Sequence, residues 1–459
     1  MLIGFSVSNF KSFKETQNIS FVASKIVRHK EHIVSQGNRK LLKSGLIFGA
    51  NAGGKSNLIE AVNFSRQIII NGLEKVNLDK KYFRINKEYY FQPGVFEYRI
   101  LAQEKEFSYG IVISYDKKEI IAEWLTRIDE DGTETDIFNR EVNEEGVSSV
   151  SSEMLYDTEE ENNRMKIYLE DFGENISETF RKKTILEDIA LRINDKQNIF
   201  VEITSVYEWF KNMIVIFPNS KYRGLNEAAA DDDMRLFYSK VRAFFDTGIE
   251  TVESQKQEMD FDKVLQDIPP EEAHRIKIDI SNQVSEHPVM FKMNQQIYIL
   301  RKDKTGNIIY NKMLLNHGNQ NDLFEYSDES DGTKRLFDLI PIFYKGRKNN
   351  VILVDEIDRS LHTNLTKKFL QMFYELMEDE KCQLIATTHD SNLLDLDLLR
   401  QDEIWFVERQ ENHSSKVYSL NKFKARFDKK IDKEYLLGRY GAIPIFEEEE
   451  LNQEIGYEE

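Results

Sequence analysis

The sequence predicts an α/β fold with a mixed β-meander lobe, a parallel-sheet core and a helical insertion. Short alternating segments bounded by turns, between residues 95 and 128, indicate the meander. Helical periodicity dominates from about residue 176 to 268. In the last third of the chain, continuously apolar strands alternate with helices, which is typical of a parallel sheet covered on both faces.

The first region, 1–128, is expected to form one lobe. Strands are expected at 2–7 and 41–48, and the apolar positions between 55 and 71 predict an amphipathic helix. The alternating segments predict an antiparallel meander, and they lie at 95–101, 107–114 and 119–128.

The second region, 129–285, is expected to be a mainly helical insertion. Its first part, 129–164, is acidic and serine-rich, which predicts a surface loop or a mobile segment. Helices are expected at 201–214 and at 234–245, and the run Asp231 to Asp233 would cap the second one.

The third region, 286–446, is expected to form a second lobe, and the acidic tail 447–459 is expected to be solvated. A helix is expected at 361–377. The strands expected in this region lie at 289–293, 297–301, 308–314, 351–354, 382–388, 403–408 and 416–420.

The composition excludes several classes of protein. The chain has 459 residues and a net charge of -18, which does not favour nucleic acid as a partner, although a local basic patch is compatible with one. The single cysteine, Cys382, excludes an internal disulfide and a cysteine-based zinc site, and it fits a reducing cytoplasm. No apolar run is long enough to span a membrane, and the N-terminus lacks the order of a signal peptide. We therefore expect a cytoplasmic protein without a membrane partner.

Residues 49–56 match the G-x-x-x-x-G-K-S pattern of a phosphate-binding loop, and they lie between an apolar strand and a helix, as the pattern requires. Backbone N–H groups of such a loop converge on phosphate oxygens, and the helix N-terminus adds positive potential. Lys55 would contact the β- and γ-phosphates of ATP, and Ser56 would bind Mg²⁺. The predicted nucleotide-binding residues are Gly49, Ala50, Asn51, Ala52, Gly53, Gly54, Lys55, Ser56 and Asn57.

Two acids, Asp355 and Glu356, end the apolar strand 351–354. At the carboxyl end of a strand in an open sheet, Asp355 would share the Mg²⁺ with Ser56, and Glu356 would orient or deprotonate the attacking water. His389 follows the next apolar strand and would donate a hydrogen bond to the γ-phosphate or to that water. Each position has an ordinary alternative, because strands often stop at polar residues and a loop histidine needs no partner.

Residues 329–335 place Ser330 and Gly332 at the start of a predicted helix. An ordinary helix N-terminus with Ser330 as its cap explains this segment equally well. Asp395 and Asp397 could be paired carboxylates of a nuclease, but no upstream strand ends in the glutamate that such a site needs. We expect them instead to cap a helix.

The order of these motifs resembles that of ABC-type ATPase heads, the class shared with chromosome-condensing, RecF-like and double-strand-break-repair proteins. A closer resemblance is to the compact ABC-type AAA-family ATPases of bacterial abortive-infection and phage-defence systems, kin of the overcoming-lysogenisation-defect proteins. It rests on segments 5–13, 402–408 and 438–444. The resemblance implies an ABC-type P-loop ATPase head. His362 stands where the family's D-loop usually has an aspartate.

The resemblance also implies roles and partners. A homodimer or higher homo-oligomer would sandwich ATP, with Ser330 and Gly332 contacting the γ-phosphate held by the partner. Glu356 would be the catalytic base, His389 would sense the γ-phosphate, and Gln92 is the candidate for the glutamine that contacts Mg²⁺. The implied function is that of a sensor or motor in anti-phage defence that controls a separately encoded effector, a nuclease or toxin. Two alternatives stay open, a RecF-like DNA-repair ATPase that binds DNA directly and a low-turnover nucleotide-sensing scaffold.

Overall fold

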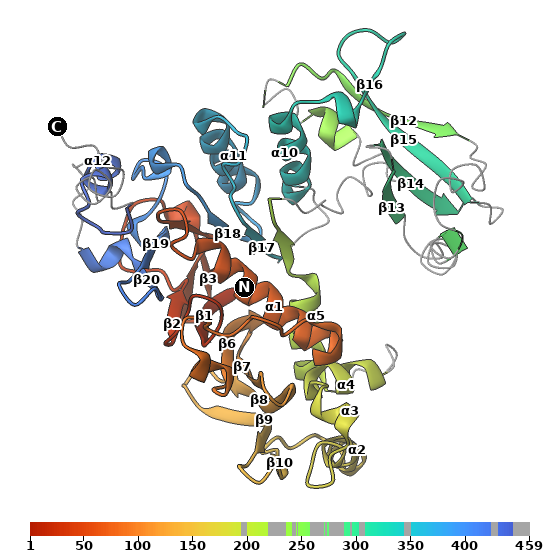
Figure 1. Cartoon of the computed structure of the whole chain (residues 1–459), viewed down its shortest axis with the longest axis vertical. Helices are drawn as coiled ribbons and strands as arrows, with labels where there is room; N and C mark the ends of the chain where they lie inside the picture. The colour runs from red at the N-terminus through yellow and green to blue at the C-terminus, as the bar shows by residue number, and fades with distance from the viewer. Residues whose placement is uncertain are drawn as a thin grey trace, which may run out of the picture. The chain divides into compact units, whose positions relative to one another are not determined.

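A computed structural model describes residues 1–193, 200–218, 236–240, 245, 247–257, 270, 273–274, 289–293, 296–302, 308–343, 350–423 and 430–443. The chain divides into two compact units, whose elements are labelled in Figure 1. Unit 1 comprises Met1–Phe217, Lys348–Asp358 and Tyr374–Glu459, and unit 2 comprises Pro218–Arg347 and Arg359–Phe373. Within the described residues, no helix is both long enough and apolar enough to cross a membrane.

The core of unit 1 is a six-stranded sheet with the order β11-β17-β18-β5-β19-β20. All neighbouring pairs are parallel except β19 and β20. Every residue of β5, β17 and β18 is buried, which explains the apolar runs Leu46–Phe48, Val351–Val354 and Leu384–Ala386 in these strands. The strands are β5 (Ser44–Phe48), β11 (Ile214–Ile216), β17 (Val351–Val354), β18 (Gln383–Thr387), β19 (Ile404–Arg409) and β20 (Ser415–Ser419).

The register of this sheet aligns the carboxyl ends of its central strands. Thr387 of β18 pairs with Ile47 of β5, and Val354 of β17 pairs with Ala386 of β18. The residues that follow these three strands therefore leave the sheet at the same edge.

A second sheet of unit 1 is antiparallel and has the order β10-β9-β8-β7-β6-β1-β2. It contains the predicted meander. A separate hairpin pairs β3 (Ile33–Gln36) with β4 (Arg39–Leu42). The strands of the sheet are β1 (Leu2–Ser8), β2 (Gln17–Ser20), β6 (Gly94–Ala102), β7 (Lys105–Ser114), β8 (Glu119–Ile128), β9 (Glu134–Val142) and β10 (Ser148–Ser151).

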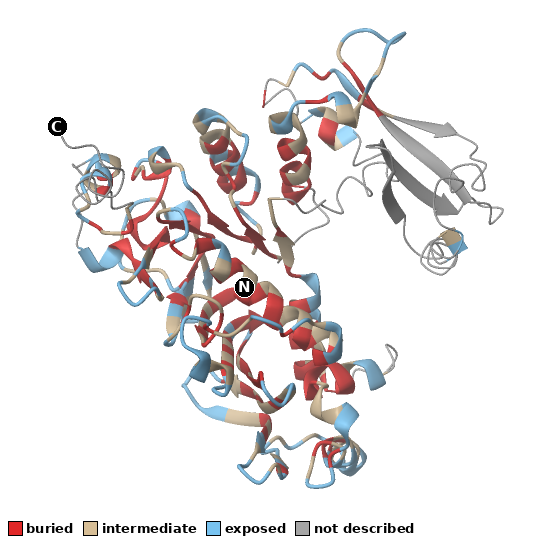
Figure 2. Cartoon of the chain, viewed as in Figure 1, coloured by how far each residue is buried: buried red, intermediate tan, exposed pale blue. Residues whose placement is uncertain are grey.

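Helix α1 (Lys55–Asn71) packs with both sheets in one apolar cluster, which joins Leu58, Ile59 and Val62 of the helix to strand residues such as Ile47 and Phe96. Figure 2 shows the buried residues along α1 and the neighbouring strands. The other helices of unit 1 are α2 (Glu159–Glu170), α3 (Glu178–Arg181), α4 (Ile185–Arg192), α5 (Val201–Asn212) and α12 (Ile431–Leu436).

The predicted loop over 129–164 is wrong, because this stretch forms β9, β10 and the start of α2. Its acidic residues occupy exposed or half-buried positions of β9 and of the first turn of α2, while Ile137 and Phe138 are buried. The single strand expected at 41–48 is also wrong. It is split into β4 and β5 around Lys43, whose buried ammonium donates to the carbonyls of Met377 and Glu378.

Unit 2 contains an antiparallel sheet with the order β12-β15-β14-β13, and β16 pairs with β15. Of the helix expected at 234–245, residues 236–240 and 245 are helical, and its proposed cap at 231–233 lies outside the described residues, as does the acidic tail. The elements are β12 (Thr251–Gln257), β13 (Val289–Met293), β14 (Gln296–Lys302), β15 (Ile308–Asn316), β16 (Phe324–Glu325), α10 (Asp331–Leu339) and α11 (Thr363–Leu376), the last of which ends in unit 1.

Candidate functional site

The loop between β5 and α1 needs its glycines for steric reasons. Gly49 has a φ of +155°, and a Cβ there would lie 2.2 Å from the carbonyl oxygen of Val407. Gly54 has a φ of +111°, and its Cβ would lie 2.2 Å from Oγ of Ser415. Side chains rarely adopt these backbone conformations, and they would also collide with β19 and β20. The loop is therefore held directly against these two strands.

Two serines support the loop from distant parts of the chain. The hydroxyl of Ser415 donates to the carbonyl of Gly53 at 2.6 Å, and it lies 2.8 Å from the hydroxyl of Ser12. Asn57, in the first turn of α1, donates its amide to the same Ser12 oxygen at 2.7 Å. These bonds fix the loop to the segment after β1 and to β20.

Lys55 is the first residue of α1, and its side chain is almost fully buried, with 3 % exposed. Its ammonium donates to the carbonyls of Gly49 at 2.7 Å and Ala50 at 3.1 Å, and it lies 3.1 Å from Nδ1 of His389. Burial lowers the pKa of Lys55 to about 8, against the opposing effect of three nearby carboxylates, foremost that of Asp358. The cation is thus held in the loop that the sequence predicts to bind phosphate.

Asp355 joins three segments at the carboxyl edge of the sheet. Its Oδ1 accepts a hydrogen bond from the hydroxyl of Ser56 at 3.0 Å and another from the hydroxyl of Thr387 at 2.6 Å. Asp355 follows β17, Ser56 lies in the first turn of α1, and Thr387 ends β18. The predicted convergence of Ser56 and Asp355 is therefore present in the structure.

Glu356 and His389 lie at the same edge. Glu356 has a left-handed backbone, with a φ of +49°, and its N–H donates to the Thr387 hydroxyl at 2.8 Å. Its Oε1 lies 3.8 Å from Nε2 of His389. The backbone N–H of His389 donates to the carboxylate of Asp358 at 3.2 and 3.3 Å. The structure thus brings Glu356, His389 and Lys55 together.

Several residues of this site were absent from the sequence prediction. Asp358 could have been suspected, because it follows the acid pair by two positions, whereas the role of Thr387 depends on the pairing of β18 with β17. Ser12 and Ser415 carry no local signal, since each is an ordinary serine whose contacts are made across hundreds of residues.

In unit 2, Ser330 is the N-cap of α10 and accepts a hydrogen bond from the N–H of Thr333 at 3.1 Å. A Cβ on Gly332 would lie 2.8 Å from the carbonyl oxygen of Ser360, so the helix start packs closely there. His362 precedes α11, and its Nδ1 accepts from the N–H of Asn364 at 3.2 Å. The helix-capping interpretation of Ser330 is therefore confirmed locally, whereas its contact with a partner's nucleotide stays a prediction.

The remaining candidates lie in turns. Gln92 is exposed, and its carbonyl accepts from Asn9 at 2.8 Å. Asp395 accepts from the N–H of Asp397 at 3.0 Å in a turn, which corrects the expectation that it caps a helix, and Asp397 forms an ion pair with Arg28.

The residues fit a magnesium–triphosphate group. Gly49 and Gly54 allow the positive φ angles of the loop between β5 and α1, the kind of turn whose backbone N–H groups can bind phosphate oxygens. Lys55 supplies a positive charge at the loop, and Ser56 and Asp355 offer oxygen donors 3.0 Å apart, the hard donors that Mg²⁺ prefers.

Comparisons with known proteins identify relatives of the chain. Two solved structures are similar to it. One, entitled "Crystal structure of the SmcHead bound to the C-winged helix domain of ScpA", has 16% identity and a TM-score of 0.43 and covers 92% of this chain and 99% of that chain. The other, the SMC head domain from Thermotoga maritima, has 12% identity and a TM-score of 0.37 and covers 91% of this chain and 98% of that chain. No curated protein sequence matches the chain.

A family profile described as "AAA domain, putative AbiEii toxin, Type IV TA system" matches residues 46–395. The match spans the phosphate loop, the acid pair and His389. It confirms the resemblance to AAA-family proteins of the abortive-infection kind. The chain belongs to this AAA-domain family.

Proposed function

We propose that the chain is a Mg²⁺-dependent ATPase that works as a nucleotide-driven conformational switch. The observation that carries this proposal is the meeting of Ser56 and Asp355, whose side-chain oxygens lie 3.0 Å apart beside the buried ammonium of Lys55. A glycine-rich loop, a lysine and two oxygen donors at one sheet edge are the parts that phosphoryl transfer requires.

Each residue has a role within this proposal. Bound Mg²⁺ would polarise the γ-phosphoryl oxygens and neutralise their charge. Lys55 and the loop N–H groups bind the phosphates, while Ser56 and Asp355 hold the metal. Glu356 accepts a proton from the attacking water, and His389, with its Nε2 3.8 Å from the Glu356 carboxylate, responds to the γ-phosphate.

Two copies of the chain would close around ATP in the proposed cycle, and hydrolysis would let them separate. Ser330 and Gly332, at the exposed N-terminus of α10, would meet the partner's γ-phosphate through a hydroxyl and backbone amides. The division expected from the sequence, with lobes at 1–128 and 286–446, an insertion at 129–285 and a tail at 447–459, stays a proposal. Within that insertion, β9 and β11 pair with β8 and β17 of unit 1.

The cellular role that we propose is control of a separately encoded effector, a nuclease or toxin, in anti-phage defence in the cytoplasm. The family description, which names a putative AbiEii toxin and a type IV toxin–antitoxin system, supports a place in such a system. The alternatives are a DNA-repair ATPase that binds DNA directly and a nucleotide-sensing scaffold with little turnover.

The deciding experiment compares wild type with Lys55→Ala and Glu356→Gln for ATP binding, phosphate release and mass in solution. We expect Lys55→Ala to bind no ATP and Glu356→Gln to bind ATP, release little phosphate and stay dimeric. If wild type releases phosphate no faster than Glu356→Gln does, the result would favour the nucleotide-sensing scaffold. DNA binding that weakens steeply with salt would favour the repair ATPase.

A further inference from the structure

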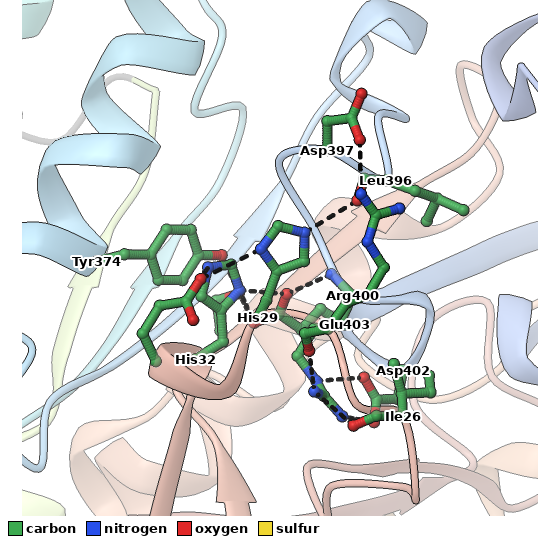
Figure 3. Close-up of polar contacts among 12 residues, drawn as sticks. Ile26, His29, His32, Tyr374, Leu396, Asp397, Arg400, Asp402 and Glu403 are labelled. Atoms are coloured by element: carbon green, nitrogen blue, oxygen red, sulfur yellow. Dashed lines mark hydrogen bonds and ion pairs between the residues drawn. The ribbon is translucent and has the colours of Figure 1, made fainter. Parts of the chain in front are cut away.

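His29, Glu31 and His32, hereafter the His–Glu–His cluster, lie on and beside the short 3-10 helix Lys30–His32 of unit 1. One candidate ligand atom from each residue can be chosen so that all three lie within 4.8 Å of one another. Figure 3 shows the two histidines beside Tyr374 and beside the segment that carries Leu396 and Glu403. The cluster uses no residue of the proposed ATP site.

The hydrogen bonds of His32 fix which ring nitrogen carries its proton. Nδ1 lies 2.9 and 3.1 Å from the two oxygens of Glu403, which also accept from Ser44 and from the N–H of Arg400. Because an ionised carboxylate only accepts, Nδ1 is the donor. In the neutral ring, Nε2 therefore keeps a free lone pair, and it lies 3.7 Å from Oε1 of Glu31.

The hydrogen bond of His29 has the opposite orientation. Its Nε2 lies 3.0 Å from the carbonyl oxygen of Leu396, so Nε2 is the donor. The lone pair of the neutral ring is then on Nδ1, which lies 3.2 Å from the same Oε1 of Glu31. Two nitrogen lone pairs and one carboxylate oxygen thus lie within 4.8 Å of one another, and a cation beside Oε1 of Glu31 could bind all three once His29 tilts out of its stacking with His32.

We propose that the His–Glu–His cluster binds a divalent transition-metal ion, with Zn²⁺ as the ion that its donors fit best. Two imidazole nitrogens and one carboxylate oxygen suit Zn²⁺, and solvent can supply the fourth ligand because Glu31 is exposed. Zinc–ligand bonds of about 2.0–2.2 Å place tetrahedral donors roughly 3.3–3.5 Å apart. The two nitrogen–oxygen distances, 3.2 and 3.7 Å, bracket that value, whereas the three ligand atoms as a set lie within 4.8 Å of one another, so the two nitrogens must approach each other when the ion binds.

The surroundings match those of metal-binding histidines, whose second nitrogen is usually held by a carboxylate or a backbone carbonyl. Glu403 has this place for His32, and the Leu396 carbonyl has it for His29. His32 is fixed against Tyr374, with ring centroids 3.5 Å apart. The planes of the two imidazole rings lie at 23° to each other. An ion that binds both rings must lie in the plane of each, so one ring has to tilt. Because His32 is fixed and the side chain of His29 is 17% exposed, His29 is the ring that tilts.

The proposed ion has a structural role. The ion would bind residues 29–32. This segment already contacts residues 396–403, which precede β19, because His29 donates to the Leu396 carbonyl and His32 donates to Glu403. Metal binding would therefore stabilise the attachment of the N-terminal segment to the parallel sheet, and removal of the ion would lower the melting temperature.

The test titrates the full-length, chelator-treated protein with Zn²⁺ by calorimetry and with Co²⁺ by visible absorption, without nucleotide. We expect one ion per chain, a tetrahedral Co²⁺ spectrum and a higher melting temperature. His29→Ala and Glu31→Ala should weaken Zn²⁺ binding at least tenfold. These two side chains are partly or fully exposed, so both variants should fold, whereas His32 is buried.

His413→Ala, at an exposed histidine outside the cluster, is the control and should bind Zn²⁺ like wild type. Lys55→Ala should also bind Zn²⁺ normally, so failure of this site and failure of the ATP site are distinguishable. The proposal is overturned if wild type shows no saturable Zn²⁺ binding, or if Glu31→Ala binds as tightly as wild type. Two imidazolium rings paired with Glu31, seen by NMR and unchanged by Zn²⁺, would overturn it as well.

Discussion

Thr387 donates its hydroxyl hydrogen to Oδ1 of Asp355 at 2.6 Å, and the same hydroxyl accepts the N–H of Glu356 at 2.8 Å. One side chain at the end of β18 thus positions both acids that follow β17. Thr387 is completely buried, so no water can replace its hydroxyl without rearrangement.

We expect Thr387→Val to lower the rate of phosphate release about tenfold or more while ATP still binds. The change preserves shape but removes both hydrogen bonds, so the two acids lose their orientation. Phosphate release and binding of a fluorescent ATP analogue would measure the two effects. Thr387→Ser, which retains the hydroxyl, is the control and should stay close to wild type. Equal rates for the Val and Ser variants would contradict this role for Thr387.

The affinity for ATP should fall as the pH rises through about 8. Burial lowers the pKa of Lys55 to about 8, so the free protein loses the ammonium above that value, and phosphate binding favours the charged form. Titration with ATP between pH 7 and 9.5 would show the decline, approaching tenfold per pH unit at the alkaline end. A Lys55→Arg variant that still binds should show a flat profile, because arginine stays charged in this range. An affinity independent of pH in wild type would refute the assignment.

Glu356→Gln should reduce hydrolysis at least a hundredfold and leave the ATP-bound dimer intact. Glutamine preserves the size of the side chain but cannot accept the proton of the attacking water. Light scattering after gel filtration with ATP and Mg²⁺ would measure the dimer. Ser330→Arg, at the exposed start of α10, should bind ATP as a monomer and fail to dimerise. Ordinary turnover by Glu356→Gln would exclude it as the base.

Gly49→Ala should abolish ATP binding and lower the melting temperature. The added Cβ would lie 2.2 Å from the Val407 carbonyl oxygen, so the loop or β19 must move. The control is Gly132→Ala, since Gly132 also has a positive φ, +87°, but no atom lies within 4 Å of the added Cβ. It should cost about 1 kcal/mol of stability and leave ATP binding unchanged. Normal ATP binding by Gly49→Ala would show that the loop tolerates the shift.

Glu123 should make the protein less stable as the pH rises from about 4.5 to about 7. Burial raises the pKa of Glu123 to about 7 in the folded chain, above its ordinary value of 4.5, so the folded state holds the proton more firmly than the unfolded state. The free energy of unfolding would decrease by about 3 kcal/mol across this interval. Denaturant unfolding of wild type and Glu123→Gln at pH 4 and pH 8 would test it. Relative to wild type, Glu123→Gln should be more stable at pH 8 than at pH 4. If the difference in unfolding free energy between the two proteins is the same at both pH values, the prediction is refuted.

The parts of the site that the sequence predicted share one property, which is a local pattern. Lys55 and Ser56 belong to a loop of fixed spacing, and Asp355 and Glu356 end an apolar strand. Thr387 was missed because its function depends on which strand lies beside β17, and strand order is a property of the folded sheet.

The difference between local sequence patterns and properties of the folded chain also explains which secondary-structure elements were predicted correctly. Strands with uninterrupted apolar or alternating sequences, such as β17 and β8, were predicted at their observed bounds. The region 129–164 was misjudged because its many acids, at exposed or half-buried positions, outnumber the buried apolar residues of β9, Ile137 and Phe138. Lys43 was read as part of a strand, although its buried ammonium binds two carbonyls and separates β4 from β5.

The support of the phosphate loop by Val407 and Ser415 has a consequence for biosynthesis. A ribosome exposes residues 49–56 early, but β17, β18 and β19 emerge only after residue 350. An incomplete chain therefore carries the glycine motif without the strands against which it folds. A chain that ends before β19 and β20 could not form the proposed nucleotide site, so such truncated copies would be inert rather than unregulated.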